Sequence, residues 1–222
     1  MSFGKNLQYL RRLSFFMTQE ALAEKLDVSR QTISKWEMDM AQPEMNKAIE
    51  LCRIFSCTLD NLFRDDLACA GEMYSNLRVE TVDEFRYVKY AVISVDPEGD
   101  AIGHMRNVAK ECKVDNPKII GWDFPRASQE QINVFHMHGY EAAWILPEGV
   151  SPKNMKVYLQ SAHKYAAIHI ENPFDDPFNT IPGAYRTLMD YMRINNLKHA
   201  DSDVIECFET DGASMDIYIA CV

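Results

Sequence analysis

The sequence predicts two domains of different class, an all-α domain of five helices followed by an α+β domain built around an antiparallel sheet. Residues 2–63 carry apolar residues at helical spacing, interrupted by residues that cap helices and form turns. From residue 87 onward, β-rich runs alternate with two helical stretches in an order that occurs twice. A chain of 222 residues is long enough for one small domain and one of ordinary size.

Composition and cysteine usage narrow the class of protein. With 47% hydrophobic and 25% charged residues, the chain has the composition of a soluble globular protein. No apolar run approaches the roughly 20 residues of a membrane helix, and the N-terminus lacks the features of a signal peptide. The six cysteines form no Cys-x-x-Cys pair, which predicts reduced thiols and no metal site. We therefore expect a cytoplasmic protein that needs no cofactor.

The first helix is expected over residues 2–14, where Leu7, Leu10 and Leu13 share one face. A pair of short helices follows in residues 18–38. Thr18 can cap the first of them, and Ser29 can cap the second after a short break. The second helix keeps polar side chains on its outer face, namely Arg30, Gln31, Thr32, Ser34 and Lys35. This is the layout of a helix-turn-helix, whose second helix enters the DNA major groove.

Residues 18–37 resemble the helix-turn-helix of the phage-repressor family, also called Cro/C1 or XRE. The matching positions are Thr18, Gln19, Leu22, Ala23, Leu26, Val28, Ser29, Ile33, Ser34, Trp36 and Glu37. The resemblance implies that Gln19 contacts the phosphate backbone, and that Ser34 or Lys35 completes the contacts. The residues implied to reach the bases are Arg30, Gln31 and Thr32. The chemistry agrees, because Arg suits guanine, Gln suits adenine, and Lys and Ser suit phosphate.

The same segment carries three smaller expectations. The family often has glycine soon after Trp-Glu, whereas here Asp39 or Met40 must end the second helix. Trp36 is expected in the core. Glu37 is expected to pair with Arg11 or Arg12.

The chain is acidic, and the charge is unevenly spread. The net charge is -10, which argues against unspecific nucleic-acid binding by the whole surface. Residues 1–66 carry nine Lys and Arg against ten Asp and Glu, so the acidic excess lies in the second part. A DNA-binding unit of such low charge must bind through local basic residues, and we expect it to act as a homodimer.

The remaining segments complete the domain plan. Pro43 opens a further helical stretch, and Thr58 caps a last short helix. We place the first domain at residues 1–66. Residues 67–85 show no clear apolar stripe and are expected to be a linker, with a short helix around 66–76 as an option. The second domain is placed at residues 86–222.

In the second domain, a strand, a helix and two strands follow one another, and this order recurs. The expected strands are 87–95, 118–125, 139–148, an extended stretch 155–171, 204–210 and 215–222, and the expected helices are 100–113 and 180–197. Two such β-α-β-β units predict one antiparallel sheet with both helices on one face. The other face is then free for a ligand.

Taken in order, fragments of this part resemble the GyrI-like effector-binding domain of multidrug-responsive and some AraC-type regulators. These fragments are GWDFP, HGYEAAWILPEG, HKYAAIHI, IPGAYRTLMDYM, CFE and MDIYIACV. The resemblance implies an aromatic pocket with a buried glutamate that attracts cationic drugs. Glu209 matches that glutamate, and Glu206, three residues earlier, is the alternative. The aromatic candidates are Trp122, Tyr140, Trp144 and Tyr185.

Together these observations favour a ligand-responsive transcription regulator. Its first domain would bind operator DNA, and its second domain would bind a hydrophobic small molecule, with lipophilic cations among the candidates. One alternative is a hydrolase in which Glu209 works with Tyr140, Tyr165 or Tyr185. The other is a protein-interaction module. The fused helix-turn-helix makes sensing the simpler reading, so we do not expect an enzyme.

Overall fold

The computed structural model describes residues 2–15, 17–65, 67, 74–124, 126–200 and 203–222. By its internal contacts the chain divides into two compact units. The first comprises Met1–Leu77 and Pro173–Lys198, and the second comprises Arg78–Asn172 and His199–Val222. The helix within Pro173–Lys198 follows a strand of the second unit in sequence, but its contacts assign it to the first unit.

Five helices form the N-terminal part of the first unit, as the sequence predicts. They are α1 (Phe3–Leu13), α2 (Gln19–Leu26), α3 (Arg30–Glu37), α4 (Met45–Ile54) and α5 (Leu59–Phe63). Each helix buries apolar side chains in a common core, and the largest fully buried ones include Leu7, Leu22 and Ile33. Trp36 is also buried, which confirms its expected place in the core.

Helix α3 ends at a left-handed aspartate, at the place where the phage-repressor family often has glycine. Asp39 takes the left-handed conformation with φ 56°. The N–H groups of Asp39 and Met40 donate back to the carbonyls of Trp36 and Lys35, which is a Schellman ending. The Asp39 carboxylate also accepts from Ser2 Oγ and from the N–H of Gly4 at 2.8 Å. Aspartate in place of glycine thus ties the end of α3 to the start of α1.

Gly4 allows this close approach, because a Cβ atom there would lie 2.5 Å from the carbonyl oxygen of Glu37. We expect Gly4→Ala to destabilise the helical domain by about 1–3 kcal/mol, since the clash is with backbone atoms that cannot rotate away. Urea unfolding followed by far-UV circular dichroism measures this. Gly103→Ala is the matched control, since no atom lies within 4 Å of a Cβ there. Equal stability of the two variants would contradict the packing argument.

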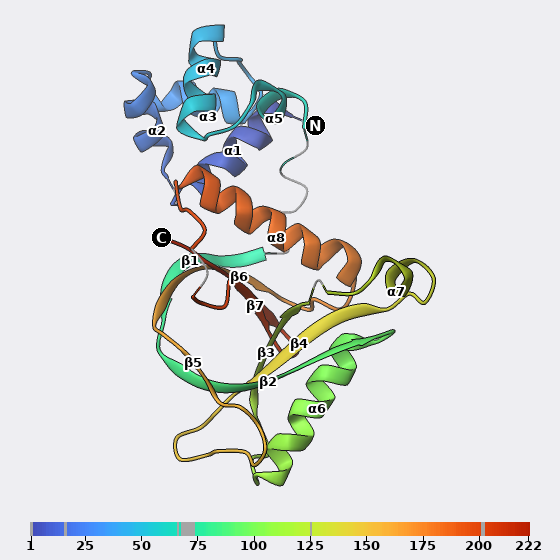
Figure 1. Ribbon diagram of the computed structural model, residues 1–222. Coiled ribbons are helices and arrows are strands. Elements are labelled where there is room, and N and C mark those ends of the chain that lie inside the picture. The colour runs from blue at the N-terminus through green and yellow to red at the C-terminus, as the bar shows by residue number, and fades with distance from the viewer. Residues whose placement is uncertain (1, 16, 66, 68–73, 125, 201–202) are drawn as a thin grey trace. The chain divides into compact units, whose positions relative to one another are not determined.

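The second unit contains a curled sheet (Figure 1). Its strands are β2 (Phe85–Ser94), β3 (Lys118–Asp123), β4 (His138–Ile145), β5 (Tyr158–Gln160), β6 (His163–Ile170), β7 (Cys207–Thr210) and β8 (Met215–Ala220). The eighth strand, β1 (Tyr74–Val82), passes from the first unit into the second. The strand order is β1-β6-β8-β7-β3-β4-β2-β5.

This order confirms the predicted duplication. β2, helix α6 (Pro97–Glu111), β3 and β4 form one β-α-β-β unit, and β6, helix α8 (Pro177–Ile194), β7 and β8 form the other. Each unit contributes three neighbouring strands, and the two sets meet where β3 pairs antiparallel with β7. β1 and β5 are the strands at the two edges.

The two faces of the sheet have different cores. Val88, Ile119 and Trp144 point to one face, where α6 covers them with Met105 and Ala109. The next residues along the strands point to the other, concave face. Its buried members are Tyr87, Ile120, Ala143, Tyr165, Ile205, Phe208 and Ala220. Period-two alternation therefore assigns each residue of β2, β3 and β4 to a face.

Two segments differ from the sequence expectations. Residues 74–82 of the expected linker form strand β1, whose half-buried pattern gives no clean alternation. The optional helix around 66–76 falls mostly on residues outside those described. A short helix, α7 (Gln129–Asn133), lies between the strands expected at 118–125 and 139–148, where no helix was expected, and Ser128 and Gln131 form a capping box there.

Helix α8 contacts the N-terminal helices within the first unit. The Tyr191 ring meets the ring of Phe15 edge-on at 5.8 Å. Asn195 Nδ2 donates to the carbonyl of Leu13 at 2.9 Å, and Arg193 donates to the carbonyl of Ser56. A helix from the second repeat is thus held by side-chain and backbone contacts to α1 and the end of α4.

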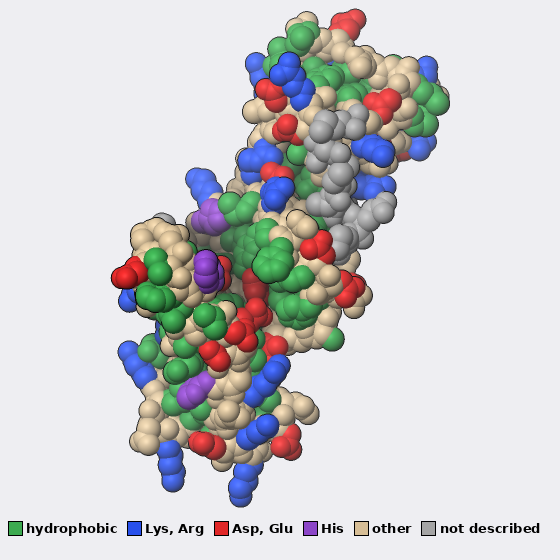
Figure 2. All heavy atoms as spheres, turned by 90° about the vertical axis from the view of Figure 1, so that its right-hand side faces the viewer, with side chains coloured by type: hydrophobic (Ala, Val, Ile, Leu, Met, Phe, Trp, Pro, Cys, Tyr) green, Lys and Arg blue, Asp and Glu red, His purple; other side chains and the backbone are tan. Residues whose placement is uncertain are grey.

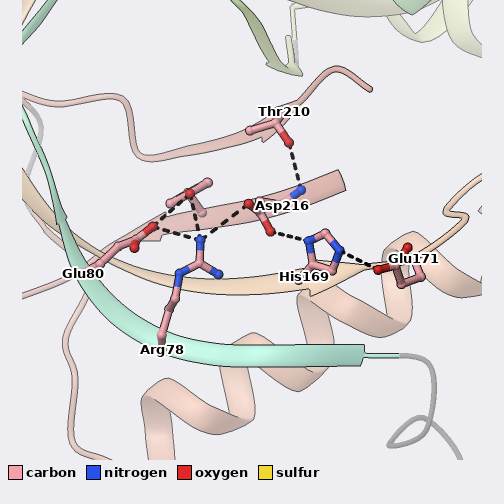
Figure 3. Close-up of polar contacts among 7 residues, drawn as sticks. Arg78, Glu80, His169, Glu171, Thr210 and Asp216 are labelled. Atoms are coloured by element: carbon pink, nitrogen blue, oxygen red, sulfur yellow. Dashed lines mark hydrogen bonds and ion pairs between the residues drawn. The ribbon is translucent and has the colours of Figure 1, made fainter. Parts of the chain in front are cut away.

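Polar contacts join β1 to β6 and β8 in the second unit (Figure 3). Arg78 donates to Glu80 and to the hydroxyl of Tyr218, both at 2.9 Å, and lies 3.5 Å from Asp216. Asp216 in turn meets His169 Nδ1 at 2.8 Å. These contacts fix the edge strand onto the sheet in the region that the sequence predicts as a linker.

Within the described part of the chain, no helix is long and apolar enough to cross a bilayer. The cysteines there carry free thiols: Cys52, Cys57, Cys112, Cys207 and Cys221. Cys69 lies outside the described residues. The same search of the described residues finds no group of three His, Cys, Asp or Glu side chains that could hold a metal ion.

Candidate DNA-binding surface and ligand cavity

The turn between α2 and α3 is built by its capping residues. Thr18 accepts from the N–H of Ala21 and Ser29 accepts from the N–H of Thr32, each at 3.1 Å. Asp27 ends α2 in the left-handed conformation, which turns the chain toward α3. On α3, Arg30, Gln31 and Lys35 are exposed, while Thr32 and Ser34 are half-buried. The polar face expected to meet DNA is therefore available on the surface of this unit.

Three side-chain contacts bear on the predicted roles. Glu37 pairs with Arg11, as one of the two sequence options has it, with Nε–Oε1 at 2.5 Å and Nη2–Oε2 at 3.0 Å. Gln19, the first residue of α2, donates to Glu37 Oε2 at 2.8 Å, so its side chain is held against the end of α3. Arg30 meets Glu20 at 2.7 Å in a pair that is more than half exposed on both sides. Such a pair is weak and leaves Arg30 able to turn toward a base.

A cavity of about 810 Å³ opens on the concave face of the sheet in the second unit. Aromatic side chains form much of its wall. Tyr87 and Tyr158 stack with their ring centroids 5.4 Å apart, and Trp122 lies on β3 across from them. Burial raises the pKa of the Tyr87 phenol, and Glu141 and Tyr158 raise it further. The phenol is therefore neutral at physiological pH.

Glu141 is the buried carboxylate of this cavity, with a side chain that is 11% exposed. Its Oε2 accepts from the indole N–H of Trp122 at 3.0 Å. Lys89 Nζ lies 3.1 Å from Oε1 and 3.2 Å from Oε2. The same ammonium lies over the ring of Tyr158, 5.1 Å from its centroid, and 6.0 Å from that of Trp122.

The strand register explains why these groups meet. Glu141 lies on β4 directly opposite Trp122 on β3, and opposite Ala91 on β2. Side chains opposite each other in antiparallel strands share a face and come within contact distance. Lys89, two residues from Ala91, reaches Glu141 diagonally. The small side chain of Ala91 leaves the space beside the carboxylate open.

Two predicted ligand residues lie on the other face of the sheet. Trp144 and Tyr140 alternate with Glu141 along β4, so both face α6 and belong to its core. The hydroxyl of Tyr140 sits against Gly121, where a Cβ atom would lie 2.2 Å away. Burial raises the pKa of the Tyr140 phenol, and the negative charge of Glu209 raises it further. Of the four predicted aromatics, Trp122 lines the concave cavity.

The predicted carboxylates are also separated by the pleat. Glu209 lies opposite Gly121 in the β3–β7 pair, and its negative charge raises the pKa of Tyr140. Both observations place the Glu209 side chain on the face of the sheet that α6 covers. Glu206 lines the cavity at an exposed position. Tyr185 lies on α8 in the first unit, and Tyr165 donates its hydroxyl to the carbonyl of Ile205 at 2.9 Å. Sequence reasoning did not single out Glu141, Lys89, Tyr87 or Tyr158.

Acidic side chains gather beside hydrophobic ones in the middle of the face shown in Figure 2. In the second unit, the start of α6 brings Asp96 and Glu98 near Asp123 and Asp211. Burial raises the pKa of Glu98 above 4.5, and the other three carboxylates raise it further. Glu98 therefore binds a proton more tightly in the folded state than in the unfolded chain.

This gives a pH-dependent prediction for Glu98→Gln. A raised folded pKa stabilises the fold below about pH 4.5, and that stabilisation is lost as pH rises through the folded value. At pH 7.5 the variant is expected to melt roughly 1–2 °C higher than the parent, because a charged, half-buried carboxylate has been removed. At about pH 3.5, below the pKa of this group in the unfolded chain, the difference should vanish. Glu111→Gln, at the exposed end of α6, is the control, and an equal gain there would contradict the assignment.

Comparisons with known proteins agree with the N-terminal geometry. Residues 7–62 match the helix-turn-helix family model. The chain is 35% identical to the HTH-type transcriptional activator BcrR of Enterococcus faecalis over 88 residues, which cover 39% of this chain and 43% of BcrR. The chain thus spans less than half of that relative. Residues 7–62 are a helix-turn-helix domain.

Similar solved structures include a cryo-EM structure of an EcmrR–DNA complex, with a TM-score of 0.48 and 15% identity. That match covers 96% of this chain and 79% of the other. Another is SAV2435 bound to tetraphenylphosphonium, with a TM-score of 0.41 and 11% identity. It covers 67% of this chain and 94% of SAV2435.

Proposed function

We propose that the chain is a ligand-responsive transcription regulator. Its helix-turn-helix domain binds operator DNA, and the concave cavity of its second unit binds a hydrophobic small molecule. The observation that carries this proposal is the presence, in one chain, of an exposed polar recognition helix and an aromatic cavity around the buried carboxylate of Glu141. BcrR, which shares the N-terminal segment, is itself a transcriptional activator.

For DNA binding, the support comes from α3. Arg30 and Gln31 are exposed in its first turn, where side chains of a recognition helix reach base edges. Arginine pairs with guanine and glutamine with adenine, so the two together can specify sequence. Because one such helix reads few base pairs, we propose that a homodimer binds a two-fold symmetric operator.

For ligand binding, the support comes from the wall of the cavity. Tyr87, Trp122 and Tyr158 offer ring faces that suit planar hydrophobic molecules. We propose Glu141 as the pocket carboxylate in place of Glu209, because Glu141 shares its face of the sheet with Trp122 and accepts the indole N–H. Glu206 would act at the exposed mouth.

Helix α8 offers a route between the two activities. In sequence it lies between β6 and β7 of the second unit, while its own side chains contact α1 and the end of α4. A ligand that shifts the strands can therefore shift a helix that the DNA-binding domain contacts. Coupling requires that the ligand bind the two arrangements with different affinity.

Selection from a pool of random 30-base-pair duplexes tests the DNA-binding half with the chain of 222 residues. We expect enrichment of one sequence, with inverted half-sites about one helical turn apart if a dimer binds. Binding of the selected duplex should exceed that of a scrambled duplex by about 1,000-fold at physiological salt. Recovery of unselected sequence after repeated rounds would contradict the proposal.

A thermal-shift screen tests the ligand half. Neutral aromatic compounds, lipophilic cations and aromatic acids are compared on the parent chain and on Trp122→Leu, which removes a ring and the indole N–H that donates to Glu141. A ligand present at 100 times its Kd stabilises the folded state against unfolding by about 2.7 kcal/mol, so micromolar binders are detectable. Shifts in the parent that are lost in the variant are expected. Shifts of equal size in both would place the ligand elsewhere.

A further inference from the structure

Lys89 occupies the place in the cavity where a bound cation would be expected. Its ammonium lies within 3.2 Å of both carboxylate oxygens of Glu141 and over the ring of Tyr158. These are the two contacts, an ion pair and a cation–π contact, by which aromatic pockets hold organic cations. The side chain of Lys89 is 28% exposed and that of Glu141 is 11% exposed, so the pair is partly withdrawn from water.

We infer that Lys89 determines the charge selectivity of the cavity, an inference that rests on the proposed ligand-binding function. Lys89 is an internal cation that neutralises Glu141. The cavity therefore takes an uncharged aromatic ligand in preference to a lipophilic cation of the same shape. This narrows the ligand class expected from the sequence, in which cations were among the candidates.

The energetic reason lies in what each ligand must disturb. An uncharged ring can stack on Tyr87, Tyr158 or Trp122 while the Lys89–Glu141 pair stays intact. A cation that approaches Glu141 must either place a second positive charge within a few ångströms of Lys89 or push the lysine into solvent. Both cost free energy, because the pair is partly desolvated and like charges repel more strongly there than in water.

The other charged groups of the cavity do not reverse this preference. Asp123, Asp203 and Glu206 line it at exposed positions, where water and salt screen them. Arg126 is also exposed, and its guanidinium lies over the ring of Phe124. The carboxylate with the least exposure is that of Glu141, and Lys89 is the cation placed against it.

The test compares two probes of similar shape, tetraphenylphosphonium and the uncharged triphenylphosphine oxide, by calorimetric titration of the full chain. In Lys89→Met the affinity for tetraphenylphosphonium is expected to rise about tenfold, because Glu141 becomes available. The affinity for triphenylphosphine oxide should change less than about threefold. Adding Glu141→Gln to Lys89→Met should abolish the gain, and Lys89→Arg should retain the selectivity of the parent.

A matched control and a second neutral variant make the test decisive. Lys156 lies over the same Tyr158 ring, 4.8 Å from its centroid, so Lys156→Met removes a nearby positive charge while leaving the Lys89–Glu141 pair. Its effect should be well below that of Lys89→Met. Lys89→Gln, which can still donate to Glu141, replaces Lys89→Met if the latter fails to fold.

The outcomes separate the inference from the function on which it rests. If the parent binds the oxide and a folded Lys89→Met or Lys89→Gln variant gains no cation affinity, the inference is overturned and the cavity remains a ligand site. A gain of equal size for both probes also overturns it. If no protein in the series binds either probe, the ligand-binding function is overturned together with the inference.

Discussion

Joint replacement of Arg30 and Gln31 by alanine is expected to weaken binding to the selected operator by about 100-fold. Each bidentate contact to a base is worth about 1–3 kcal/mol, and both side chains lie on the exposed first turn of α3. Because the pair of Arg30 with Glu20 is exposed, the substitutions should leave the melting temperature within about 1 °C of the parent. Fluorescence anisotropy with labelled duplex measures the loss.

Two further variants separate base reading from general electrostatics. Arg64→Ala removes a positive charge from the exposed end of α5 and should change affinity less than about threefold. Lys35→Ala should weaken binding to all sequences alike and lower the salt slope by about one, as expected of a phosphate contact. If Arg30 and Gln31 can be removed without loss, α3 is not the helix that reads the bases.

Much of the fold could be predicted because its signals are local. Thr18 and Ser29 cap their helices by contacts to residues three positions on, and such contacts are visible as spacing in the sequence. The order of strands and helices along the second domain likewise predicted its two β-α-β-β units. β1 was missed because an edge strand with a half-buried pattern carries no clean period.

The ligand site was harder to predict because it depends on which face each residue takes. Trp144 and Glu141 are three residues apart on one strand and therefore point to opposite faces. Assigning Trp144 to the core under α6 would have placed Glu141 on the free face. The sequence signal for this was a lone carboxylate in the apolar run GYEAAWI. The partnership of Glu141 with Lys89 depends on strand register, which spacing alone cannot supply.

The grouping of α8 with the N-terminal helices shows a second limit. Its sequence position makes it the partner of α6 in the repeat, and its apolar pattern fits that role. Its contacts through Tyr191, Arg193 and Asn195 join it to the first unit instead. Arg193 and Asn195 donate to backbone carbonyls, and carbonyls carry no sequence signal. A contact of this kind can be found only in three dimensions.

Glu37→Ala is expected to lower the free energy of unfolding of the helix-turn-helix domain by about 3–5 kcal/mol. Glu37 accepts two hydrogen bonds from Arg11 and one from Gln19, and its side chain is 3% exposed. Removal of the carboxylate leaves the Arg11 guanidinium, 12% exposed, without its counter-charge. Peptide-level hydrogen exchange of the full chain should show loss of protection in α1, α2 and α3.

The expected loss of stability is large because the Arg11–Glu37 pair is buried, and an exposed ion pair on α4 serves as the matched comparison. Glu50 pairs with Lys47 at 2.9 Å on α4, but both side chains are 30–41% exposed. Glu50→Ala should therefore change stability by less than about 0.5 kcal/mol. Glu37→Gln should fall between the two alanine variants, since its amide can still accept from Arg11. Equal effects of Glu37→Ala and Glu50→Ala would mean that the Arg11–Glu37 pair does not hold α1 to α3.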